Sequence, residues 1–136
     1  MRPKRSKEDV QEDVVNFWFD TIYKEFPTIG DKQMYYDLFA SGMLKFFTVN
    51  LTGIFAYIIH EWRGKKVLSE MIFYILPAYR GKLSLVKRYI QRAEKVAVKN
   101  GCGEILIGGN IGFKDDIFLK LLGRWGYKGH TVSKEL

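Results

Sequence analysis

The middle of the chain holds three apolar runs separated by very short connections, and this pattern restricts the fold more than any other feature of the sequence. The runs span residues 44–51, 54–62 and 67–76, and β-branched and aromatic side chains dominate them. Glycine and asparagine bound the runs, which is typical of β-strands. The connections at Leu51–Gly53 and Arg63–Lys65 are short, so the sequence predicts antiparallel pairing of neighbouring strands.

Residues 83–100 show the pattern of a strongly amphipathic helix. Apolar side chains recur at helical spacing, at Leu85, Val86, Tyr89, Ile90, Ala93, Val96 and Ala97. The opposite face is basic and carries Lys87, Arg88, Arg92, Lys95 and Lys99. Gly101 ends the helix, and residues 104–108 predict a short buried strand. Because the helix is long enough for a crossover, this strand is predicted to lie parallel to a neighbour.

The remaining segments predict further helices and strands. Residues 6–26 and 30–43 have helical periodicity, and residues 114–125 follow the same pattern. A short extended start and a last strand at residues 127–136 complete the order β-α-α-β-β-β-α-β-α-β. This order predicts an α/β or α+β fold with a mixed, mostly antiparallel central sheet flanked by helices. The length of 136 residues, without a linker, predicts one domain over residues 1–136.

The composition narrows the classes of protein. Lysine and arginine outnumber aspartate and glutamate by 22 to 15, giving a net charge of +7, and a basic surface attracts anions such as nucleic acid and phosphorylated cofactors. The sequence lacks the apolar stretch of a membrane span or a signal peptide. The single cysteine, Cys102, leaves no internal disulfide and no cysteine zinc site. This cysteine usage predicts a reducing, cytoplasmic setting. His60 and His130 have no ordered carboxylates beside them, so we expect no metal site.

Residues 75–90, ILPAYRGKLSLVKRYI, connect the third apolar run to the basic helix. A proline ends the strand, and an Arg-Gly-Lys turn precedes the first helical turn. Backbone N–H groups at a helix N-terminus bind anions with the help of the helix dipole, and glycine lets the backbone approach closely. The arrangement suits an anion, although an ordinary connection with solvated basic residues has the same pattern.

Four segments resemble, in order and spacing, the GNAT superfamily of acyl-CoA-dependent N-acetyltransferases. They are RPKRSKEDVQEDVVNFW, ILPAYRGK, AVKNGCGEILIG and LLGRWGYK. The resemblance extends over nearly the whole chain. It implies a GNAT-like sheet, acetyl-CoA as cosubstrate without a metal, and an amine acceptor that is a small molecule or a protein.

The resemblance also implies which residues contact coenzyme A. The family pattern Arg/Gln-x-x-Gly-x-Gly/Ala falls on the pyrophosphate-binding residues Arg80, Gly81, Lys82, Leu83, Ser84 and Leu85. Arg80 matches, whereas Leu83 and Leu85 stand where small residues are usual, and Lys82 supplies a compensating point charge. A backbone N–H near Tyr74, Ile75 and Leu76 would polarise the thioester. Asn110 is a candidate contact for the pantetheine amides or, alternatively, a turn residue.

Glu70 is the candidate general base. On a regular strand it shares a face with Leu68, Ile72 and Tyr74, and apolar neighbours raise the pKa of a carboxyl group, as a general base requires. The resemblance implies a base glutamate on the same strand. The alternative is a glutamate on an edge strand that faces water.

The sequence has no residue that matches the general acid of the family. Many family members have a tyrosine five residues before the final aromatic, and here Tyr127 is that aromatic while Leu122 occupies the tyrosine position. Leucine donates no proton, so Tyr74 becomes a substitute candidate, with a core tyrosine as its alternative. His60 is a candidate for substrate binding or proton transfer, or a strand-end histidine without a role.

Three functions are therefore open. The first is an N-acyltransferase that moves an acyl group from acetyl-CoA directly to an amine, with Glu70 as base. The second is a non-catalytic accessory or regulatory protein of the same fold, for instance a viral one, since Leu83, Leu85 and Leu122 depart from the family pattern. The third is nucleic-acid binding through the basic face of the helix at residues 83–100.

Overall fold

The computed structural model describes residues 7–27, 32–108, 120, 122–127 and 132–136. It divides into two compact units, Met1–Tyr36 and Asp37–Leu136. The first unit contains α1 (Lys7–Glu25) and the beginning of α2 (Lys32–Ala40). The ring of Phe19 in α1 contacts Tyr35 and Tyr36 in α2, with centroids 5.7 and 5.3 Å apart. The extended start, predicted to be a strand, lies outside the described residues.

The second unit is built on a mixed sheet of five strands in the order β1-β2-β3-β4-β5. The strands are β1 (Leu44–Phe47), β2 (Gly53–Trp62), β3 (Lys65–Ile75), β4 (Glu104–Ile107) and β5 (Val132–Glu135). All neighbours are antiparallel except β3 and β4, which are parallel. The α+β class and the mostly antiparallel sheet are therefore confirmed, as is the parallel pairing on either side of the long helix.

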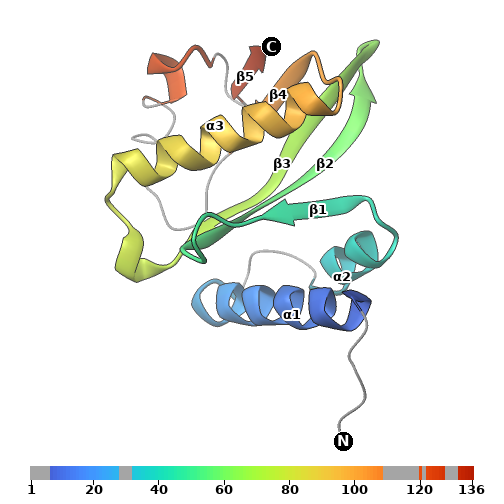
Figure 1. The fold of residues 1–136 in the computed structure, drawn as a ribbon, viewed down its shortest axis with the longest axis vertical. Coiled ribbons are helices and arrows are strands. Elements are labelled where there is room, and N and C mark those ends of the chain that lie inside the picture. The colour runs from blue at the N-terminus through green and yellow to red at the C-terminus, as the bar shows by residue number, and fades with distance from the viewer. Residues whose placement is uncertain (1–6, 28–31, 109–119, 121, 128–131) are drawn as a thin grey trace, which may run out of the picture. The chain divides into compact units, whose positions relative to one another are not determined.

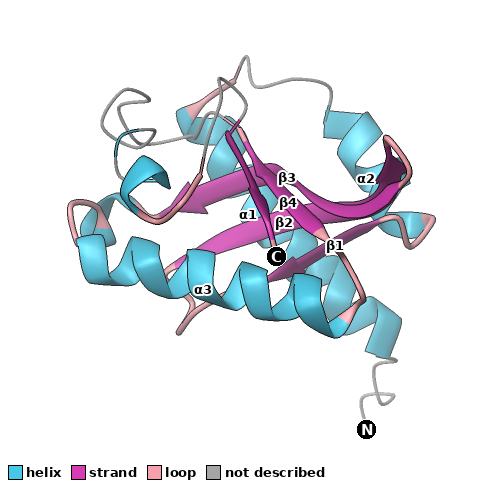
Figure 2. Ribbon diagram, turned by 90° about the horizontal axis from the view of Figure 1, so that it is seen from above, coloured by secondary structure: helices cyan, strands magenta, loops and turns pink. Residues whose placement is uncertain are grey.

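Helix α3 (Leu83–Lys99) lies across one face of this sheet (Figures 1 and 2). Its apolar stripe packs on the sheet and forms the main core with side chains from β1 to β4. Aromatic rings dominate the centre of this core, where Tyr89 contacts Phe47 and Phe73 at centroid distances of 6.1 and 5.2 Å. The stripe predicted from the sequence is confirmed, since Leu85, Val86, Tyr89, Ile90, Ala93 and Ala97 are all buried.

Strand β1 is shorter than predicted because the chain turns sharply after Phe47. Asn50 and Leu51 have φ values of 50° and 57°, which extended backbone does not adopt. The turn is held against α3, because the Val49 N–H donates to the Tyr89 hydroxyl at 3.1 Å. Thr52 closes the turn by donating its hydroxyl proton to the Val49 carbonyl at 2.6 Å.

The C-terminal segment is described only in part. Lys120 and residues 122–124 are helical, within the helix predicted at residues 114–125. The last strand begins at Val132 rather than at residue 127, because Tyr127 belongs to the end of the preceding helical segment, where its N–H donates to the Leu122 carbonyl at 3.1 Å. No helix in the described ranges is long and apolar enough to cross a membrane.

Candidate functional site

The candidate site lies where β3 and β4 separate. The two strands pair through only Val67–Glu104, Leu68–Ile105 and Ser69–Leu106. β4 ends at Ile107, whereas β3 continues to Ile75. Residues 70–75 of β3 therefore extend beyond the part of the strand that β4 covers.

Glu70 is the first residue of β3 beyond this paired segment. Its side chain is partly buried, and one carboxylate oxygen, Oε2, accepts a hydrogen bond from the Gly108 N–H at 3.4 Å. Burial raises the pKa of Glu70 from its ordinary value of 4.5 to about 8, and the bond from Gly108 offsets only part of that increase. Glu70 therefore exchanges its proton near neutral pH, as a general acid or base does.

The predicted neighbours of Glu70 are wrong in part, because β3 is not regular. The register with β2 shifts between the pairs Ala56–Ile72 and Tyr57–Glu70, which leaves Met71 as an extra residue. Glu70 lies opposite Tyr57 on the α3 face of the sheet, together with Leu68. Beyond the bulge it is Phe73 and Ile75 that pack into the α3-side core, so Ile72 and Tyr74 lie on the other face. Tyr74 is thus not a proton donor beside Glu70.

The backbone direction of β3 distinguishes the candidate amides at its end. The Leu76 N–H donates to the Thr52 carbonyl at 2.9 Å, toward β2. Because backbone groups alternate along a strand, the Tyr74 N–H also points toward β2, and the Ile75 N–H points to the side where β4 has ended. Of the residues proposed to polarise a thioester, Ile75 alone has the required direction, and Tyr74 and Leu76 do not.

The connection from β3 to α3 passes through a short 3₁₀ turn, Pro77–Tyr79, and then through Arg80, Gly81 and Lys82. Gly81 has φ +86°, a conformation that favours glycine, and a Cβ there would meet nothing within 4 Å. Lys82 is the N-cap of α3, and its carbonyl accepts from the Leu85 N–H at 3.1 Å. Within the described part of the chain, nothing accepts a hydrogen bond from the N–H groups of Leu83 and Ser84.

The two leucine side chains at the start of α3 lie in different surroundings. Leu85 is only 7% exposed and packs in the core beneath α3, while Leu83 is 57% exposed. Lys82 lies with its Nζ 5.6 Å from the ring centroid of the exposed Tyr79. The first turn of α3 therefore presents backbone amides and one lysine in a conformation that an anion can approach.

Arg80 has a structural partner of its own. Its Nε donates to the Ile75 carbonyl at 2.9 Å, and its guanidinium lies 5.3 Å from the ring centroid of Tyr74. These contacts fasten the turn to the end of β3. Arg80 therefore stabilises the loop, in addition to the predicted role of its positive charge in binding an anion.

His60 lies apart from Glu70. Its Nε2 is 2.6 Å from the Ser69 Oγ. His60 is three residues from Tyr57 along β2, so the two side chains lie on opposite faces of the sheet, and Glu70 shares the Tyr57 face. The structure does not bring these two predicted site residues together.

Leu122, at the position where the resemblance implies a tyrosine, lies in the core. Leu122 is fully buried, and the Tyr127 hydroxyl donates to the Glu94 Oε1 at 3.0 Å. Burial and the neighbouring Glu94 carboxylate raise the pKa of Tyr127. Lys134 completes this group, with its Nζ 3.5 Å from the same Glu94 oxygen. Asn110 lies outside the described residues.

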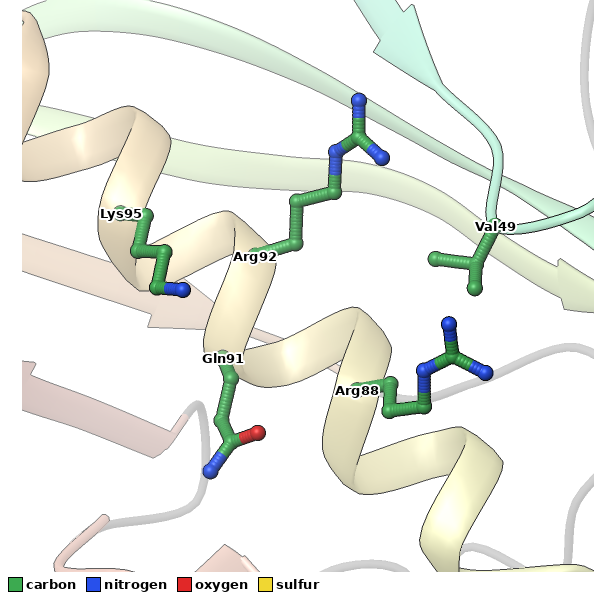
Figure 3. Close-up of a pocket in the computed structure, with 5 residues that line it drawn as sticks. All are labelled: Val49, Arg88, Gln91, Arg92 and Lys95. Atoms are coloured by element: carbon green, nitrogen blue, oxygen red, sulfur yellow. The ribbon is translucent and has the colours of Figure 1, made fainter.

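Two features of the structure have no strong signal in the sequence. The Gly108 N–H contacts Glu70 only because β4 ends just before it, one residue earlier than the strand predicted at residues 104–108. The second is a pocket of about 360 Å³ on α3, lined by Arg88, Gln91, Arg92, Lys95 and Val49 (Figure 3). The helical residues were predicted to be a basic face, but Val49 comes from a distant turn.

Comparison with known proteins gives no relative: no protein-family model, no curated protein and no solved structure matches this chain. The class that the fold defines is therefore α+β, with a mixed five-stranded sheet and helices. Groups of three or more His, Cys, Asp or Glu side chains able to hold a metal ion do not occur among the described residues.

Proposed function

We propose that this protein is an acyl-CoA-dependent N-acyltransferase, a divergent member of the GNAT superfamily that transfers an acetyl group to an amine. The observation that carries the proposal is Glu70, a partly buried carboxyl group with a pKa of about 8 at the point where two parallel strands separate. The part of β3 that extends beyond β4 and the start of α3, whose N-cap residue makes no side-chain capping hydrogen bond, lie at the two ends of the same connection. Glu70 would be the general base, the backbone at the end of β3 would donate an N–H to the thioester carbonyl oxygen, and the start of α3 would bind the phosphates.

The residues at the start of α3 fit the diphosphate of coenzyme A. The N–H groups of Leu83 and Ser84 are available to phosphate oxygens, and the helix dipole favours negative charge there. Lys82 adds a full positive charge beside them. Leu85 takes no space at this turn because its side chain lies in the core.

The chemistry assigned to Glu70 is removal of a proton from the acceptor. An amine is protonated at neutral pH, and the nitrogen attacks only after Glu70 has taken its proton. The nitrogen then bonds to the acyl carbon and releases a second proton to solvent, the carbon–sulfur bond breaks, and the departing sulfur receives a proton from solvent. The Ile75 N–H, which points to the open side of β3, would stabilise the negative charge that develops on the acyl oxygen.

The separation of these groups requires water. Ile75 lies five positions beyond Glu70, about 16 Å along an extended strand. A proton from an amine near Ile75 would therefore reach Glu70 through intervening water molecules. Because the acting form is the ionised carboxylate, the rate should rise with pH through about 8.

A second candidate is a protein of the same fold that binds coenzyme A without catalysis. Leu122, fully buried, supplies no hydroxyl at the family's acid position, and the Tyr127 hydroxyl is hydrogen-bonded to Glu94. This arrangement favours binding without a dedicated proton donor for the leaving thiol.

Calorimetric titration with acetyl-CoA tests the binding step shared by both candidates. We expect Lys82→Ala to weaken binding about tenfold, the effect of one lost charge contact of roughly 1.4 kcal/mol. Lys99→Ala, at the other end of α3, removes the same charge and should leave the affinity unchanged. Equal affinities for the three proteins would remove this turn from the site.

Turnover separates the two candidates. Acetylation of a panel of small amines and peptides is followed by thiol release, with wild-type protein and Glu70→Gln. The transferase predicts at least about a 100-fold loss in kcat for Glu70→Gln with acetyl-CoA affinity retained. Binding without turnover for any amine would favour the non-catalytic candidate, and unchanged kcat in the variant would exclude Glu70 as the base.

A further inference from the structure

A basic pocket lies on the solvent side of α3, apart from the site at Glu70. Arg88, Gln91, Arg92 and Lys95 line it from the helix, and Val49 lines it from the turn after β1. Its volume is about 360 Å³. Figure 3 shows the Arg88 side chain reaching toward Val49, with the Arg92 guanidinium further along the same side of the helix.

The walls of this pocket are held in place by the core. The Val49 N–H is bonded to the Tyr89 hydroxyl at 3.1 Å, which ties the turn to α3. The Arg92 guanidinium lies 5.3 Å from the ring centroid of Phe47, a cation–π contact that orients it. Two of the elements that form the pocket are therefore preorganised before any ligand arrives.

The positive charges in the pocket have no acidic partner among the described residues. In the described part of the chain, no carboxylate forms an ion pair with Arg88, Arg92 or Lys95. Glu94 lies on the same helix, but it bonds to Tyr127 and Lys134 and lines a separate pocket. Three cations without acidic partners define a site for an extended or multiply charged anion.

The basic residues continue beyond the pocket in a single row. Arg88, Arg92, Lys95 and Lys99 are spaced by four, three and four residues, so they follow one stripe of the helix. At 1.5 Å per residue the row is about 16 Å long. The row is therefore long enough to contact several successive phosphates of one strand. A single phosphate ion would occupy only part of it.

We propose that the pocket and this row of α3 bind the phosphate backbone of a nucleic acid. The aromatic residues beneath the row, Phe47 and Tyr89, are buried, so the surface offers charge and hydrogen-bond donors but no stacking platform. Binding is therefore largely independent of base sequence. The inference does not depend on the acyltransferase proposal, because it uses none of the residues at the start of α3.

Fluorescence anisotropy with labelled single-stranded DNA and RNA of about 20 nucleotides tests this proposal. Three or four phosphate contacts predict that log K falls with log salt concentration with a slope of about −2 to −3 for single strands. The triple variant Arg88→Gln, Arg92→Gln, Lys95→Gln should bind about 100-fold more weakly at about 0.1 M salt, since each contact contributes about 0.7 to the slope. A double-stranded competitor shows which form of nucleic acid binds better.

The matched control removes the same charge elsewhere. Lys24, Lys66 and Lys120 are exposed and do not line the pocket, and replacing all three by Gln should leave most of the affinity intact. Thermal unfolding verifies that both triple variants remain folded, and the charge-preserving pair Arg88→Lys, Arg92→Lys should retain binding. Equal losses in the two triple variants would overturn the proposal, as would equally tight binding of polyglutamate or saturation of the pocket by inorganic phosphate alone.

Discussion

Replacing Glu70 by glutamine should stabilise the protein at high pH, and the size of the effect follows from the surroundings of this side chain. Burial raises the pKa of Glu70 from 4.5 to about 8. One pKa unit corresponds to about 1.4 kcal/mol, so ionisation of Glu70 in the folded protein costs up to about 5 kcal/mol. Glutamine has nearly the same shape, keeps an oxygen to accept the Gly108 N–H, and does not ionise.

The sign of the pH dependence follows from proton binding. Between about pH 4.5 and pH 8 the folded protein holds the Glu70 proton while the unfolded chain has released it. The folded state therefore binds more protons, and the free energy of unfolding falls as pH rises through this window. Below about pH 4.5 both states are protonated, and the contribution to stability is fully present.

Urea unfolding of the wild type and of Glu70→Gln at about pH 5, 7 and 9 measures this contribution. The difference in free energy of unfolding between the two proteins isolates Glu70 from every other titrating group. We expect the variant to gain several kcal/mol relative to the wild type between about pH 5 and pH 9. A difference that stays constant with pH would refute the assignment of a raised pKa to this carboxyl group.

Three further substitutions test the packing that surrounds the site. Gly53→Ala should destabilise the protein by about 3 kcal/mol or more in urea unfolding, because its Cβ would overlap a backbone carbonyl of β3. Gly103→Ala, where a Cβ meets nothing within 4 Å, is the control, and an equal cost would refute the clash. Tyr89→Phe should cost about 1–3 kcal/mol, because the buried Val49 N–H loses its acceptor; an unchanged urea midpoint would contradict that role. Leu122→Tyr should destabilise by about 1–3 kcal/mol without raising acetylation, since the site is full; higher turnover would show that a hydroxyl there can act.

The sequence predicted the sheet and the long helix because both depend on local pattern. The short connections around Gly53 and Gly64 leave only antiparallel pairing for β1, β2 and β3. The apolar stripe of α3 has a period that fits no strand, and its length requires a crossover. These features are decided by residues close together in the chain, and they agree with the structure.

The site was harder to predict, because its geometry depends on a shift of one residue in the pairing of β3 with β2. The alternation rule places Glu70 and Tyr74 on one face, and the extra residue Met71 moves them to opposite faces. Whether a strand contains a bulge is decided by its partner strand, and the sequence of β3 alone carries no such signal. The partnership of Val49 with α3 is likewise a contact between residues about forty positions apart.

The extra residue in β3 also limits how this chain can change length. Deleting Met71 would restore strict alternation, and one half of the strand would then have to rotate half a turn about its own axis. Either Glu70 would leave the helix-side layer, or Phe73 and Ile75 would be expelled from the interior while Ile72 and Tyr74 replaced them. Insertions and deletions should therefore be tolerated in the hairpin at Arg63–Lys65 and rejected within this strand.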